Sequence, residues 1–149
     1  MSDALAERGL ALELARFPSS TRTAADAAHS VGCQVAQIAK SLVFRTTGGE
    51  PLLIVASGAN RVDVAKVAAL VGEPLEMADA AFVRDRTGFA IGGVPPVGHD
   101  RTLPTYVDRD LFAFDRIWAA AGAPDAVFLL SPGQLLEITG GTVVDVRVR

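Results

Sequence analysis

The sequence has few of the residues from which disulfides, metal sites and membrane spans are built. Its 149 residues include one cysteine, Cys33, and two histidines, with no cluster at the spacing of zinc ligands. A single cysteine excludes an internal disulfide. No apolar run reaches the roughly 20 residues that a spanning helix needs, and residues 1–8 lack a signal-peptide pattern. We therefore expect a cytoplasmic protein with no metal, no cofactor and no membrane partner.

The sequence also has fewer basic than acidic residues. The chain has 14 Lys and Arg against 17 Asp and Glu, which gives a net charge of −3 at pH 7. This balance argues against a broad electrostatic grip on nucleic-acid backbone, so DNA is not an expected partner. A basic patch on one face is still compatible with the composition. The length suits a single domain, residues 1–149, and half of the residues are hydrophobic, which is enough for one core.

The apolar pattern predicts more strands than helices. Strands are expected over residues 10–15, 38–45, 51–57, 75–78, 89–91, 103–107, 117–121, 126–130 and 142–148. Short helices are expected over residues 3–8, 24–31, 63–71, 79–86 and 131–138. Several strands are joined by hairpin turns, whereas others are separated by helices. We therefore predict an α+β fold: a mixed, curved sheet or partial barrel surrounded by helices.

The most distinctive stretch is Gly92-Gly93-Val94-Pro95-Pro96-Val97-Gly98. Its prolines fix φ, while its glycines allow positive φ and close approach of another backbone or a ligand. Free N–H groups in such a loop can form a pocket for an oxyanion. The structural alternative is a tight turn between two strands. His99 follows the loop and is either a base or a solvated loop residue.

Lys40 is unusual because it lies in an apolar strand. Period two places it on one face with Ile38, Leu42 and Phe44. Either its stem packs along the strand while the ammonium reaches solvent, or the ammonium points into a cleft. We find no convincing Ser/His/Asp set, and Cys33 is interpreted as a small buried hydrophobe. A Schiff-base enzyme that uses Lys40 therefore stays open as an alternative.

Taken together, four segments resemble the YbaK/ProX family, the free-standing aminoacyl-tRNA deacylases. This family is similar to the editing domain inserted in bacterial prolyl-tRNA synthetases. The segments are residues 21–28 with Gly32, residues 38–43, residues 93–98 as a Gly-x-x-Pro-x-Gly loop, and the tail from Trp118 to Asp145. Each motif alone is weak, but their order and spacing together are specific and cover nearly the whole chain.

The resemblance implies hydrolysis of the ester that links a small, wrong amino acid to the 3′ terminal adenosine of a tRNA, with proline tRNA expected. The amino acid is left open among alanine, cysteine, serine, threonine and a small non-protein residue. The essential lysine of the family maps to Lys40, and its glycine loop, which holds the aminoacyl group by backbone, maps to Gly93, Pro96 and Gly98. A ribose hydroxyl of the substrate is implied to help activate the water.

The expected catalytic residues are therefore Lys40, Gly93 and Gly98. Substrate binding is assigned to Gly92, Val94, Pro95, Pro96, His99, Ser57 and Asn60. The acceptor end of an aminoacyl-tRNA is the expected partner, together with prolyl-tRNA synthetase as a protein partner. A second alternative is a non-catalytic module of the same fold that binds tRNA or a synthetase.

Overall fold

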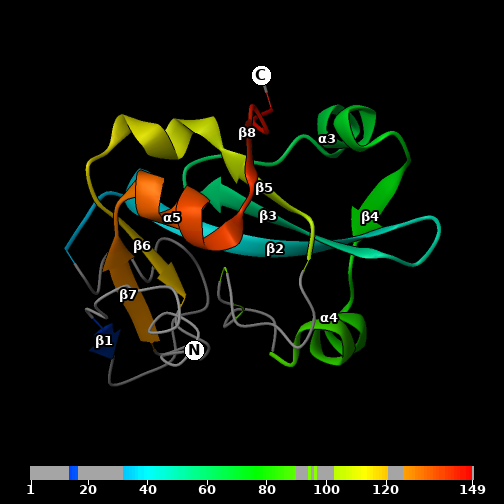
Figure 1. Ribbon diagram of the computed structural model, residues 1–149, viewed down its shortest axis with the longest axis horizontal. Helices are drawn as coiled ribbons and strands as arrows, with labels where there is room; N and C mark the ends of the chain where they lie inside the picture. Colours follow the sequence, from blue (N-terminus) through cyan, green and yellow to red (C-terminus); the bar gives the residue numbers. More distant parts are fainter. Residues whose placement is uncertain are drawn as a thin grey trace.

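A mixed sheet forms the centre of the part of the chain that the structure describes (Figure 1). The computed structural model describes residues 14–16, 32–89, 94, 96, 103–120 and 126–148. Within these ranges the sheet has eight strands, seven of them on the path β1-β7-β6-β2-β3-β5-β8, and β4 pairs with β2 beside that path. The strands are β1 Leu14–Arg16, β2 Ile38–Thr46, β3 Pro51–Ser57, β4 Leu75–Met77, β5 Thr105–Asp108, β6 Ile117–Ala120, β7 Ala126–Leu130 and β8 Thr142–Val144.

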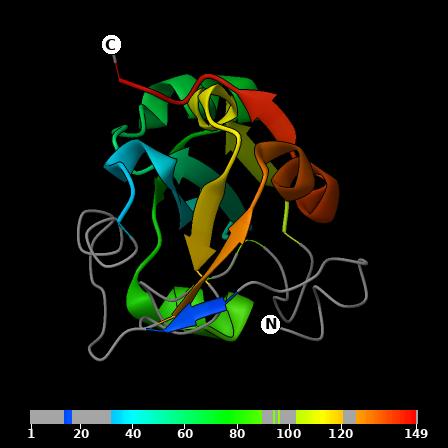
Figure 2. The same cartoon turned by 90° about the vertical axis from the view of Figure 1, so that its left-hand side faces the viewer.

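Among the described residues, three short α-helices and two 3-10 helices lie around this sheet. They are α3 Val64–Val71, α4 Ala80–Thr87, α5 Pro132–Thr139, η1 Val35–Gln37 and η2 Arg109–Ala113. Each α-helix begins at a side chain that caps it, namely Asp63, Asp79 and Ser131. In two views at right angles, α3 lies on one side of the β2–β3 hairpin and α4 on the other (Figures 1 and 2). None of the described helices is long and apolar enough to cross a membrane.

The β2–β3 hairpin separates two hydrophobic clusters. The continuous apolar run of β3 sends Leu53 and Val55 into the larger cluster, and Leu52, Ile54 and Ala56 into the smaller one. Alternate side chains of a strand point to opposite faces. All five of these side chains are 2 % exposed or less, so β3 is covered on both faces, as its sequence predicts.

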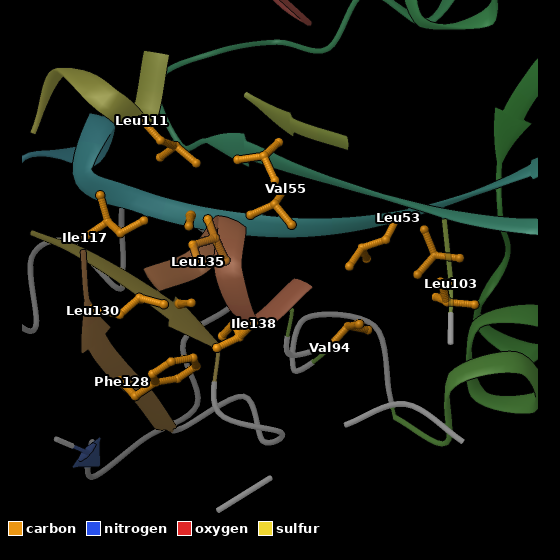
Figure 3. Close-up of a cluster of buried hydrophobic side chains, with 14 of the residues drawn as sticks. Leu53, Val55, Val94, Leu103, Leu111, Ile117, Phe128, Leu130, Leu135 and Ile138 are labelled. Carbon is orange, nitrogen blue, oxygen red and sulfur yellow. The ribbon is translucent and has the colours of Figure 1, made fainter. Parts of the chain in front are cut away.

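The larger cluster joins the hairpin to β6, β7 and α5 (Figure 3). Phe128, Leu130 and Leu135 from the last third of the chain pack here with Leu53 and Val55. The smaller cluster contains Phe44 from β2, Val67 from α3 and Val146 near the end of the chain. Because both faces of β2 and β3 are packed, the position of a residue on these strands decides which of the two clusters its side chain faces.

The pairing register places residues of three strands in one row. Lys40 on β2 pairs with Ala56 on antiparallel β3. Val55 pairs with Val107 on parallel β5, so the next step along both strands brings Ala56 beside Asp108. Side chains at paired positions share a face. Lys40, Ala56 and Asp108 therefore lie side by side on the face of the smaller cluster.

The predicted α+β fold with a mixed sheet is confirmed, although several strand boundaries differ from the prediction, among them those of β5 and β8. Strand β5 continues to Asp108, because this carboxylate accepts backbone N–H groups and so suits a strand end. Strand β8 ends at Val144, because the chain then turns away and Asp63 N–H donates to the Val146 carbonyl at 2.7 Å. The helices expected over residues 3–8 and 24–31, and most of the strand expected over 89–91, lie outside the described residues.

Candidate active site

Lys40 is held by a backbone carbonyl from the loop that follows β3. Its Nζ donates a hydrogen bond to the Asn60 carbonyl oxygen at 2.7 Å, across 20 residues of sequence. An ammonium has three N–H donors. Among the described residues this is the hydrogen bond that Lys40 makes, so two of its donors have no partner within that part of the chain.

The electrostatic setting of Lys40 combines two opposed effects. Burial of the half-buried side chain lowers the pKa of its ammonium, since removal from water disfavours the charged form. The negative charge of Asp108 acts in the other direction and raises that pKa. Burial is the larger of the two, so the pKa of Lys40 lies below its ordinary value. Asp108 thus helps to keep a partly desolvated ammonium charged.

Asn60 connects this lysine to two carboxylates. Its Nδ2 donates to Asp108 Oδ2 and to Asp110 Oδ2, both at 2.8 Å. Its backbone N–H donates to the Ser57 carbonyl at 2.9 Å. Because both side-chain acceptors are carboxylates, the amide group of Asn60 must present its nitrogen to them. These bonds hold Asn60 in place, and with it the backbone carbonyl that accepts from Lys40.

Asp108 is fully buried and lies at the centre of the network, with an exposed fraction of 0 %. Oδ2 accepts from Ser57 N–H at 3.0 Å and from Asn60 Nδ2, while Oδ1 accepts from Asp110 N–H at 2.9 Å. A buried carboxylate is tolerated when donors surround it in this way. The network joins the end of β3, the end of β5 and the first half of β2.

Three residues predicted from the sequence are brought together here: Lys40, Ser57 and Asn60. The side chains of Ser57 and Asn60 are already engaged within the protein. The Ser57 hydroxyl donates to the Ala36 carbonyl at 2.8 Å, and the amide of Asn60 donates to the two carboxylates. In the structure these two residues therefore support Lys40.

Sequence reasoning missed both acids of the network. Asp108 and Asp110 directly follow the apolar segment 103–107, and the prediction ended its strand at Val107. One feature of the sequence could have pointed to Asp108: it is an acidic residue at the end of an apolar strand. The strand beside it in the fold, β3, also ends at a polar residue. Only the register of β3 with β5 brings that acid beside Ala56 and Lys40.

Two residues of the glycine–proline loop are described, Val94 and Pro96, and both are buried. Val94 is 3 % exposed and packs in the larger cluster with Leu53 and Leu103 (Figure 3). Its side chain thus lies on the opposite face of the sheet from Lys40. The predicted site residues Gly92, Gly93, Pro95, Gly98 and His99 lie outside the described residues.

Cys33 has the surroundings of a packing residue. It packs against Ile38 together with Val35 and Trp118, and its Sγ–H donates to the Gln34 carbonyl at 3.3 Å. Burial raises the pKa of the thiol, which disfavours the reactive thiolate. Across the described ranges, no group of three or more His, Cys, Asp and Glu side chains is arranged to hold a metal ion.

Comparison with known proteins identifies the family. The model of the aminoacyl-tRNA editing domain matches residues 18–138, a range that contains Lys40, Asn60, Asp108 and the glycine–proline loop. The chain belongs to this family. The resemblance seen in the sequence is confirmed, and with it the class of enzyme: an editing deacylase that acts on aminoacyl-tRNA.

Relatives of this editing domain come from two bacteria. YwhH of Bacillus subtilis, an uncharacterized protein, is 33% identical over 127 residues, which cover 85% of this chain and 81% of the relative. The Enterococcus faecalis protein EbsC, described as a "putative Cys-tRNA(Pro)/Cys-tRNA(Cys) deacylase", is 30% identical over 126 residues, 78% of this chain and 77% of the relative.

A solved structure agrees with the fold of the editing domain. It is described as a "putative trans-editing enzyme for prolyl tRNA synthetase" and is 48% identical, with a TM-score of 0.94 over 99% of this chain and 94% of that chain. The agreement extends over the whole sheet and its helices. The Lys40 network therefore sits in an editing-domain fold.

Proposed function

We propose that this editing domain removes a small, non-cognate amino acid from mischarged proline tRNA. The observation that carries the proposal is the half-buried Lys40 ammonium, fixed at 2.7 Å on the Asn60 backbone carbonyl, with two N–H donors that have no partner among the described residues. The names of EbsC and of the solved relative, which refer to proline tRNA and its synthetase, support the choice of tRNA. They leave cysteine as one candidate among the small amino acids.

The reaction is hydrolysis of an ester. Water adds to the carbonyl carbon of the aminoacyl group, a tetrahedral oxyanion forms, and the bond to the ribose oxygen breaks. The products are a free amino acid and a tRNA with a free 3′ terminal hydroxyl. We assign to Lys40 the binding of a terminal phosphate or the ester by its ammonium group, because charge-assisted contacts hold such oxygens well. Backbone N–H groups at Gly93 and Gly98 are assigned to the oxyanion.

Selection against cognate proline is assigned to the glycine–proline loop. A pocket discriminates poorly between a side chain and a slightly smaller one, which is why synthetases need separate editing. The loop residues Gly92, Pro95 and Pro96 are proposed to shape a space for small side chains. The acceptor end of the tRNA, and a prolyl-tRNA synthetase that delivers it, are the proposed partners. A net charge of −3 suits recognition confined to that end.

A panel of mischarged proline tRNAs tests this proposal. Alanine, cysteine, serine and threonine are each loaded on proline tRNA, and release of the free amino acid is followed over time. We expect at least one of these esters to be hydrolysed while proline on the same tRNA is spared. If well-folded protein releases none of the four, or releases proline equally fast, the proposed substrate is wrong. The same amino acids loaded on their own tRNAs show whether the amino acid or the tRNA is recognised.

A further inference from the structure

We propose that Asp108 is a positioning residue for Lys40, acting through the loop that contains Asn60. Its role as a support for catalysis rests on the proposed function, whereas its effect on Lys40 itself does not. The loop leaves β3 at Ser57 and returns its Asn60 carbonyl to the ammonium of Lys40. Asp108 contacts both ends of this loop with a single oxygen atom.

Both oxygens of the Asp108 carboxylate accept hydrogen bonds. Asp108 Oδ2 accepts from Ser57 N–H at 3.0 Å at the start of the loop and from Asn60 Nδ2 at 2.8 Å at its end. The other oxygen, Oδ1, accepts from Asp110 N–H at 2.9 Å. Every partner of the carboxylate is an N–H donor. An amide in its place would turn an NH2 group toward one of these donors, so only a carboxylate satisfies all three.

Charge gives Asp108 a second effect on the same lysine. The row Lys40, Ala56, Asp108 places the lysine and the aspartate on strands either side of Ala56, one of the smallest residues. Asp108 is fully buried, and opposite charges interact more strongly away from water. The carboxylate therefore holds the Asn60 carbonyl in place and also favours the charged form of Lys40.

The other charged groups near this row form ion pairs with residues other than Lys40 and Asp108. Asp110 meets Arg147 at 3.7 Å, and Arg109, which follows Asp108 in the chain, meets Asp145 at 3.5 Å. Among the described residues no Arg forms an ion pair with Asp108. Lys40 is accordingly the cation whose state depends on this carboxylate.

The experiment uses the fact that the chain has two lysines, Lys40 and Lys66. With 13C-labelled lysine, each Cε signal is followed by NMR as the pH rises, and Lys66→Met identifies which signal is which. We expect Asp108→Asn to lower the pKa of Lys40 and to slow single-turnover deacylation about tenfold or more, because small displacements of an active-site group have effects of this size. The deacylation rate should fall at high pH as Lys40 loses its proton. In Asp108→Asn this fall should occur at a lower pH than in the parent, shifted by the same amount as the pKa of Lys40.

Asp79→Asn is the matched control, since Asp79 also accepts a backbone N–H, from Phe82 at 2.8 Å, but at the start of α4. It should leave the Lys40 titration and the rate unchanged. A folded Asp108→Asn protein with an unchanged Lys40 titration and a normal rate would overturn the proposal.

A second variant covers the case in which Asp108→Asn does not fold. Asn60→Ser keeps the backbone carbonyl and removes the amide that links it to Asp108 and Asp110. We expect it to slow deacylation about tenfold while the Lys40 pKa stays near that of the parent, because the Asp108 charge is still there. A parental rate in the folded variant would overturn the proposal. The NMR titration needs no substrate, so it still tests Asp108 if the proline tRNA assignment fails.

Discussion

Lys40 and Asp108 lie on either side of Ala56 in one row across three strands, although 68 residues of sequence separate them. The order of these three residues follows from the register of β2 with β3 and of β3 with β5. Their function follows from the contacts: Lys40 meets the Asn60 carbonyl, and Asp108 holds Asn60. A lysine that looks isolated in the sequence is thus part of a connected polar network in the fold.

Replacement of Lys40 by methionine is expected to preserve or increase the stability of the fold at neutral pH. The lowered pKa of Lys40 shows that the folded state disfavours its charge. Between its folded and unfolded pKa values the unfolded chain binds the extra proton, so the free energy of unfolding of the parent rises with pH in that window. Methionine does not titrate. The advantage of Lys40→Met over the parent should therefore be largest at about pH 7 and shrink toward about pH 10.

Urea unfolding of the parent and of Lys40→Met at these two pH values measures this difference. A variant that is less stable than the parent at neutral pH would mean that the bond to Asn60 outweighs the burial of the charge. Lys40 would then be a residue that stabilises the fold through its bond to Asn60.

A larger side chain at Ala56, between Lys40 and Asp108 in the row, should disturb the site without removing either charge. Ala56 is 0 % exposed, so Ala56→Val adds volume to a filled space and should cost about 1–3 kcal/mol of stability. It should also lower the rate of deacylation by the folded protein. Thermal unfolding and single-turnover rates check both effects. Ala59→Val, at an exposed position of the adjoining loop, is the control and should change neither.

The glycine–proline loop is predicted to act through its backbone. Gly98→Ala adds one methyl group, which should either restrict the loop conformation or block the approach of the substrate. We expect a large loss of rate with the fold retained, measured by single-turnover deacylation and circular dichroism. Gly133→Ala is the control, because the nearest atom to an added Cβ there is Ser131 Oγ at 3.9 Å. Near-normal hydrolysis by Gly98→Ala would leave this loop with a structural role only.

Hydrolysis is predicted to need no metal ion. The sequence has two histidines and one cysteine, and the described residues include no cluster suited to a metal. Deacylation rates measured before and after dialysis against a chelator should agree within error. A rate that is lost with the chelator and returns on addition of zinc would contradict this prediction.

Local patterns were enough to predict most of the described elements. The apolar run of β3, the alternation around Lys40, and the starts of three helices each depend on neighbours in sequence. The strand β3 was placed correctly, and the helices predicted from residues 63, 79 and 131 begin one residue later. The mixed sheet could also be predicted, because hairpin turns and intervening helices are visible in the sequence.

Long-range pairing was the part that the sequence did not supply. Nothing near residue 108 indicates that β5 pairs in parallel with β3, and without that pairing Asp108 is one acid among many. Trp118 is likewise one apolar residue among many in the sequence, whereas in the fold it is partly buried and packs on Ile38 where β2 pairs with β6. In both cases the outcome depends on which strands become neighbours.

The most direct test of the account compares Lys40→Met with Lys66→Met in deacylation of the best substrate from the mischarged proline tRNA panel. Both variants lose a lysine charge, but Lys66 bonds to Asp145 and the Arg147 carbonyl, and no hydrogen bond among the described residues joins it to Lys40, Asn60 or Asp108. Loss of a charge-assisted contact costs on the order of 1.5–3 kcal/mol, a roughly ten- to hundredfold effect on rate. We expect Lys40→Met to be nearly inactive and Lys66→Met to keep the parental rate. A folded Lys40→Met protein that deacylates as fast as the parent would contradict this expectation.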